Sequence, residues 1–111
     1  MRLSGALAVA AGLLWAAAGL AAPPRLALIV GIDSYPDPAI HDLSGAVNDA
    51  KLWAATLKHR FGFTEAEIRL LVNGQATRAG IERAFREHLI AKAGQGTAAV
   101  FIYSGHGSRQ A

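Results

Sequence analysis

The stretch "RLALIVGID", residues 25–33, decides the fold class of this chain. Its apolar part, residues 26–32, is an unbroken run rich in branched side chains, which is typical of a strand buried on both faces of a sheet. Two similar runs follow at residues 68–72 and 98–103. Strands buried on both faces belong to parallel sheets covered by helices on either side. The pattern therefore predicts an α/β fold.

Helical periodicity fills the two intervals between these strands. Ser44 stands where an N-cap is expected for the first helix, and Gly62 ends it. The apolar stripe of that helix comprises Val47, Ala50, Trp53, Ala54 and Leu57. Residues 64–67 form a capping-box pattern for a single turn, and Thr77 opens the second helix. Its inner side carries Ile81, Ala84, Phe85, His88 and Leu89.

Alternating strands and helices predict right-handed βαβ units, with the second and third strands on opposite sides of the first. Ligands of such sheets bind beyond the carboxyl ends of the strands, where the strand order reverses. Asp33 follows the first strand, Asp49 lies in the first turns of the following helix, and His106 follows the third strand. We therefore expect these three residues at one edge of the sheet.

Composition excludes several kinds of site. The 111 residues include no cysteine, so the segment contains no disulfide, no thiolate metal site and no cysteine nucleophile. The net charge of +3 is spread along the chain without a block of like charges, so we expect no nucleic-acid partner. His41, His59 and His88 lie on different predicted elements without a metal-ligand spacing, and we expect no metal site.

The N-terminus has the three parts of a secretory signal peptide. A basic start at Arg2 precedes an apolar stretch, residues 3–20, and the small residues Ala21 and Ala22 follow. We expect residues 1–21 to be removed and the protein to be exported, to the periplasm or beyond, with no stable membrane span left after cleavage. The alternative is an N-terminal anchor, because the stretch is close to the ~18-residue lower limit for a membrane span.

The glycines on either side of His106 let the backbone turn sharply and approach a ligand. An imidazole there can act as a general base near neutral pH; the alternative is a turn histidine hydrogen-bonded to a neighbouring loop. The role of Asp49 also has two interpretations. It can line a functional site, or it can simply be stabilised by the positive end of the helix dipole, as carboxylates at helix starts are. Asp33 and Asp37 are interpreted as turn formers, and Gly31 as a close-packing position.

Four ordered blocks of the chain resemble the caspase-like cysteine peptidases, most of all their bacterial metacaspase (orthocaspase) branch. They are "RLALIVGIDSY" (25–35), "LSGAVNDAKLWAATL" (43–57), "GFTEAEIRLLVNGQATRAGIERAF" (62–85) and "AAVFIYSGHG" (98–107). The resemblance implies a caspase-like three-layer sandwich with a mostly parallel sheet, of which this chain holds three strands and two helices. Residues 25–111 are expected to be the N-terminal portion of that catalytic domain.

The resemblance also implies residue roles. His106 matches the general base of a cysteine–histidine dyad, the N–H of Gly107 matches an oxyanion-hole donor, and Asp49 matches a wall of the pocket for a basic P1 side chain. In the family the nucleophilic cysteine follows the histidine by about 50 residues, beyond Ala111. Many metacaspases have a cysteine where this chain has Ala46. This difference does not affect the cysteine–histidine dyad.

The function implied is that of an exported cysteine endopeptidase acting on peptides or proteins, after Arg or Lys, with this segment inactive by itself. Only one of the two acidic residues expected for a basic P1 side chain, Asp49, lies in this segment. The second normally lies beside the nucleophile. No cofactor is expected within the segment, and calcium dependence of the full-length protein stays open. Two alternatives remain: a non-catalytic caspase-like binding or scaffolding domain, and an unrelated α/β binding domain.

Overall fold

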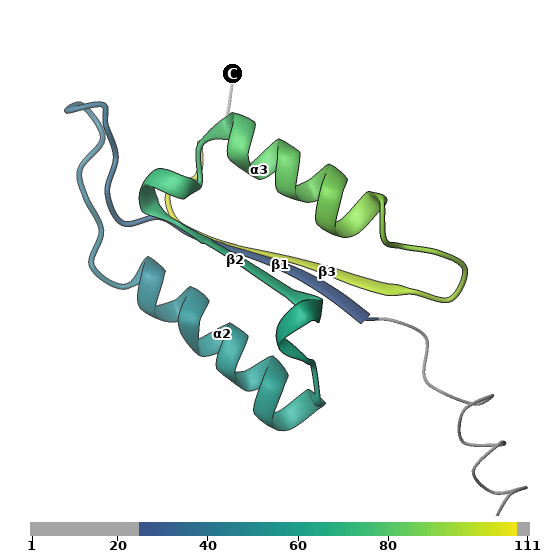
Figure 1. Ribbon diagram of the computed structural model, residues 1–111. Coiled ribbons are helices and arrows are strands. Elements are labelled where there is room, and N and C mark those ends of the chain that lie inside the picture. The colour runs from purple at the N-terminus through teal and green to yellow at the C-terminus, as the bar shows by residue number, and fades with distance from the viewer. Residues whose placement is uncertain (1–24, 109–111) are drawn as a thin grey trace, which may run out of the picture.

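A computed structural model describes residues 25–108, which form one three-stranded parallel sheet (Figure 1). Its strands are β1 (Arg25–Gly31), β2 (Ile68–Val72) and β3 (Ala98–Ser104), in the order β2-β1-β3. The predicted α/β class, the parallel pairing and the central place of the first strand are confirmed. The predicted signal peptide, residues 1–21, lies outside the described residues.

The register aligns the carboxyl ends of all three strands. Gly31, the last residue of β1, pairs with Val72 of β2 on one side and with Ser104 of β3 on the other. The loops that leave the three strands therefore begin at the same edge of the sheet. This is the edge at which ligands of parallel α/β sheets bind.

One helix covers each face of the sheet (Figure 1). Helix α2 (Ala46–Phe61) packs on one face, and α3 (Arg78–Ala84) lies on the other and continues directly into the π-helical segment η3 (Phe85–Ile90). Two 3₁₀ turns, η1 (Glu65–Glu67) and η2 (Asn73–Gln75), precede and follow β2. The π-helical geometry was not expected from the sequence.

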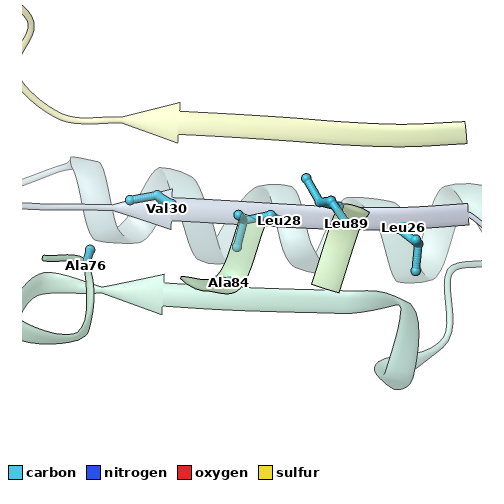
Figure 2. Packing of buried hydrophobic residues seen from close by; sticks show 6 residues of the cluster. All are labelled: Leu26, Leu28, Val30, Ala76, Ala84 and Leu89. Carbon is cyan, nitrogen blue, oxygen red and sulfur yellow. The ribbon is translucent and has the colours of Figure 1, made fainter. Parts of the chain in front are cut away.

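Strand β1 supplies side chains to two separate cores, because successive residues of a strand point to opposite faces. The core under α3 consists of Leu26, Leu28, Val30, Ala76, Ala84 and Leu89 (Figure 2). The core under α2 consists of Ala27, Ile29, Ala50, Ala54, Leu57 and Phe63. Fully burying a Leu, Ile or Val side chain stabilises a protein by about 1.5–3 kcal/mol, so β1 is the main contributor to both layers.

Gly31 lets α2 approach the sheet closely. A Cβ atom placed on this glycine would lie 2.6 Å from the Cβ of Ala50 and 2.9 Å from the carbonyl oxygen of Ala46. Both distances are shorter than van der Waals contact, so no larger residue fits without moving the helix. The prediction that Gly31 is a close-packing position is confirmed.

The same close approach changes which side of α2 is buried. The fully buried positions are the small residues Ala46, Ala50 and Ala54, together with Leu57. Trp53, which the sequence placed in the buried stripe, is 48% exposed, so this part of the prediction is wrong. At Gly31 the residues of α2 that meet the sheet are Ala46 and Ala50, and Trp53 does not belong to this contact.

The turn before β2 is connected to its neighbours by polar groups. Glu67 Oε1 accepts the N–H of Thr64 at 2.8 Å, as expected for a capping box, and Oε2 accepts the N–H of Arg25 at 3.1 Å. The backbone hydrogen bonds from Thr64 and Arg25 lower the pKa of Glu67. His88, buried on the inner side of its helix as predicted, places Nε2 3.0 Å from the carbonyl oxygen of Glu67.

Strand β3 is an edge strand of the described sheet, with no strand of residues 25–108 on its outer side. Phe101 and Tyr103, on the sheet face that α3 covers, are almost half exposed. Phe101 contacts Phe85 edge to face, with ring centroids 5.8 Å apart. Within the described part of the chain, no helix has both the length and the apolar character needed to cross a membrane.

We expect Gly31→Ala to destabilise the protein by about 1–3 kcal/mol, because the added methyl overpacks the contact with Ala50 and Ala46. Urea unfolding followed by circular dichroism measures this loss. Gly74→Ala is the control, since a Cβ at Gly74 meets no atom within 4 Å. Equal stability of the two variants would contradict the packing argument.

Candidate functional site

Asp33, the second residue after β1, caps helix α2 from a distance. Its Oδ1 accepts the N–H of Ala46 at 2.8 Å, and its Oδ2 accepts the N–H of Val47 at 3.3 Å. Ser44 makes no such bond, and the N-cap position itself is Gly45, so the predicted Ser44 cap is wrong. A carboxylate from the strand end replaces it, because it satisfies two free N–H groups and faces the positive end of the helix dipole.

Asn73 fixes the same loop from the β2 side. Its Oδ1 accepts the N–H groups of Asp33 at 2.8 Å and Ser34 at 3.1 Å. Asn73 has a φ of 48°, in the left-handed region that asparagine tolerates better than most residues. The exit of β1 is therefore bound both to the start of α2 and to the end of β2.

His106 lies in the turn that follows β3, where its main chain is held on both sides. Its N–H donates to the Tyr35 hydroxyl at 2.7 Å, and its carbonyl accepts from the Tyr103 hydroxyl at 2.7 Å. Ile32 donates to the carbonyl of Ser104 at 3.0 Å, which extends the β1–β3 pairing up to this turn.

The imidazole of His106 is oriented by His41 of the loop after β1. Nε2 of His106 lies 2.9 Å from the carbonyl oxygen of His41, and the two rings meet edge to face with centroids 4.6 Å apart. A carbonyl only accepts hydrogen bonds, so Nε2 must carry the proton. Nδ1 has no hydrogen-bond partner among residues 25–108, and in the neutral ring with Nε2 protonated it is the nitrogen that accepts a proton.

The structure bears on one of the two interpretations of His106. The ring is hydrogen-bonded to a neighbouring loop, as a structural turn histidine would be. That bond uses Nε2 and leaves Nδ1 unused, so it does not exclude a role of the ring as a general base.

An open hollow of about 400 Å³ lies directly against this imidazole. Its walls come from the loop after β1 and from the turn after β3. They consist of Tyr35, Ala39, Ile40, His41, His106, Gly107 and Ser108. The hollow borders both the imidazole and the exposed Gly107, the residue expected as the oxyanion-hole donor.

Asp49 lies in the first turn of α2 and lines a different hollow, of about 270 Å³. Its other walls are Leu52, Trp53 and Thr56. The exposed Asp49 carboxylate makes no hydrogen bond or ion pair with any of residues 25–108, in contrast to that of Asp33. Of the three residues expected at this edge, Asp33 is structural, while His106 and Asp49 line separate hollows.

Sequence reasoning missed Tyr35, His41 and Tyr103, all of which contact His106. Tyr35 and His41 belong to a loop that reads as a generic Pro- and Asp-rich turn, and no periodicity marks either residue. Among the described residues, no three or more His, Cys, Asp or Glu side chains gather into a group suited to a metal ion.

Comparison with known proteins gives matches along all of the described residues. The family model for the caspase domain matches residues 24–111. Metacaspase-9 of Arabidopsis thaliana is 37% identical over 91 residues, and metacaspase-7 of the same plant is 39% identical over 90 residues. Each match covers 77% of this chain but only 27% and 22% of those relatives, so the chain spans about a quarter of their length.

We expect Asp33→Ala to destabilise the protein by about 0.5–2 kcal/mol, the usual cost of losing a helix cap. Asp33→Asn should lose less, because the amide oxygen still accepts one N–H. Asp37→Ala is the matched control, since its carboxylate accepts only the N–H of Ala39 within an exposed loop. Thermal unfolding compares the three, and an Asp33→Ala midpoint no lower than that of Asp37→Ala would contradict the capping role.

Proposed function

The chain belongs to the caspase-domain family of peptidases, with metacaspases among its relatives, and from this we propose that it carries the histidine half of a cysteine–histidine peptidase site. The observation that carries the proposal is the hydrogen bond between His106 Nε2 and the carbonyl of His41. It selects the tautomer whose Nδ1 accepts a proton, in a ring that faces an open hollow.

The proposed reaction is acyl transfer. A thiolate, supplied by a cysteine outside these 111 residues, attacks the scissile carbonyl and forms a thioester. His106 accepts the thiol proton at Nδ1 and then protonates the leaving amine, after which water hydrolyses the thioester. The N–H of Gly107 is proposed to stabilise the oxyanion, a contribution worth about 3 kcal/mol per donor.

The hollow at Asp49 supports a preference for basic side chains at P1. Its wall is mainly apolar, formed by Leu52 and the half-exposed Trp53, with one carboxylate that is not engaged by residues 25–108. Arg and Lys match this composition, because their methylene stems pack on apolar surface while the charged head pairs with an acid. Arg adds stacking on an indole and bidentate pairing with a carboxylate.

We also propose that the protein acts outside the cytoplasm. The proposal rests on the signal-peptide pattern of residues 1–21 alone. N-terminal sequencing of exported material should find a chain beginning after Ala21 or Ala22.

A second candidate function is a non-catalytic caspase-like binding domain. The 111 residues contain no cysteine, so the nucleophile that distinguishes the two functions is not supplied by this segment. In that case His106 would be a structural turn residue, and the hollow beside it would bind a peptide without cleaving it.

Turnover of Arg-P1 and Lys-P1 peptides by the full-length protein tests the peptidase proposal. We expect His106→Ala to reduce kcat by about 10²–10⁴-fold, the usual contribution of a general base. His59→Ala on the exposed surface of α2 is the matched control. Peptide binding by the wild type without any turnover would establish the binding-domain alternative instead.

We expect Asp49→Ala to lower kcat/KM for Arg-P1 peptides by about tenfold or more, because it removes one partner of a charge pair. The fold should survive, since an acid in the first helical turn contributes only about 0.3–1 kcal/mol through the dipole. Matched Arg, Lys and Asp P1 peptides are compared in wild type, Asp49→Ala and the control Asp37→Ala. Unchanged Arg turnover, or a wild-type preference for Asp, would leave Asp49 as an ordinary helix-start residue.

A further inference from the structure

Two phenolic hydroxyls converge on the main chain of His106, one on each side. Tyr35 accepts the His106 N–H at 2.7 Å, and Tyr103 donates to the His106 carbonyl at 2.7 Å. Tyr103 comes from β3 itself, whereas Tyr35 comes from the loop after β1, 71 positions before His106. The peptide groups before and after the His106 Cα are therefore both fixed by side chains.

The hydrogen-bond partners determine where the hydroxyl proton of each tyrosine points. A backbone N–H only donates, so the Tyr35 oxygen is the acceptor for His106 and its own proton points to the carbonyl of Ile32, 3.3 Å away. Tyr103 must donate, because its partner is a carbonyl. Partial burial raises the pKa of Tyr103 and keeps this donor protonated.

Gly105 explains how the two hydroxyls reach the turn. A Cβ on Gly105 would lie 2.7 Å from the Tyr103 hydroxyl and 2.8 Å from the Tyr35 hydroxyl. Both tyrosines therefore occupy the space that any side chain at this position would fill. Because glycines flank His106, the turn has little conformational preference of its own, and an external constraint is needed to fix it.

Tyr35 also connects the turn to the loop that orients the imidazole. Its N–H donates to Asp42 at 3.1 Å, next to His41, whose carbonyl receives the bond from His106 Nε2. The Tyr35 ring is tilted against the imidazole, with centroids 5.0 Å apart. The main chain and the ring of His106 are thus both set by the loop after β1.

We propose that Tyr35 and Tyr103 are positioning residues, whose hydroxyls fix the Gly105–His106–Gly107 turn so that the imidazole and the Gly107 N–H face the same reacting carbonyl. The inference rests on the proposed function and adds two residues outside the dyad. Both hydroxyls are engaged by main-chain groups, Tyr35 by the His106 N–H and the Ile32 carbonyl and Tyr103 by the His106 carbonyl. Their removal should therefore change the rate of the chemical step and leave substrate affinity almost unaltered.

The kinetic test compares Tyr35→Phe and Tyr103→Phe in the full-length protein with Arg-P1 peptides. Phenylalanine keeps the ring and its packing and removes only the hydroxyl. A small misplacement of catalytic groups reduces rates by up to about 10²-fold, so we expect kcat to fall by about 10–100-fold with KM within about threefold of wild type. Ser34→Ala, which removes an exposed hydroxyl from the same loop, is the control and should change neither constant.

A second measurement is independent of peptidase activity. In the isotope-labelled protein, the His106 amide should exchange faster with solvent and shift upfield in Tyr35→Phe, because a 2.7 Å hydrogen bond is lost. The ¹⁵N shifts of the His106 ring should lose the pure Nε2–H pattern as the turn becomes mobile. Ser34→Ala should leave all of these signals unchanged.

Gly105→Ala gives a further check that keeps both hydroxyls, since the added methyl displaces them from His106. It should reproduce the kcat loss and the amide signature of Tyr35→Phe, and it replaces that variant if Tyr35→Phe does not fold. Unchanged kcat and an unchanged His106 amide in Tyr35→Phe would overturn the positioning role. A wild-type protein without turnover, but with the amide response intact, would refute the peptidase function and leave the tyrosine pair as a fixing element of the turn.

Discussion

The hydrogen bonds from the first N–H groups of α2 to the Asp33 carboxylate are the interaction on which the rest of the structure depends. They close the loop between β1 and α2 and fix where the helix begins. The helix can then lie against the sheet because Gly31, two residues earlier, has no side chain. One short segment at the end of β1 therefore determines both the helix–sheet distance and the course of the loop that carries Tyr35 and His41.

The candidate site is a consequence of strand register. β1 and β3 end at the same level, so the loop after one and the turn after the other meet without a long connection. The loop after β1 supplies an acceptor for the His106 main chain and another for its ring, while β3 supplies the Tyr103 donor. His106 is held at its N–H, its carbonyl and Nε2, whereas Nδ1 has no partner among residues 25–108. A base fixed in this way needs little reorganisation when a proton is transferred.

Family membership indicates the kind of function, and the geometry explains how individual residues are held. The caspase-domain match covers all of the described residues and makes proteolysis the leading proposal, while the chain spans only about a quarter of the length of the plant relatives. The geometry adds what a family assignment cannot: the tautomer of His106, the structural use of Asp33 and the apolar surroundings of Asp49. His106 and Asp49 line two separate hollows.

The sequence by itself determined the burial of β1 on both faces, the close-packing role of Gly31 and the place of His106 after β3, because periodicity and glycine positions act over a few residues. The strand order followed from the alternation of strands and helices, because βαβ units are right-handed. Only the tertiary structure decided that Asp33 and not Ser44 caps α2, that Trp53 is half exposed, and that Tyr35 and Tyr103 meet at His106. Those outcomes depend on the distance between helix and sheet and on contacts across up to 71 positions, which exist only once three strands are in register.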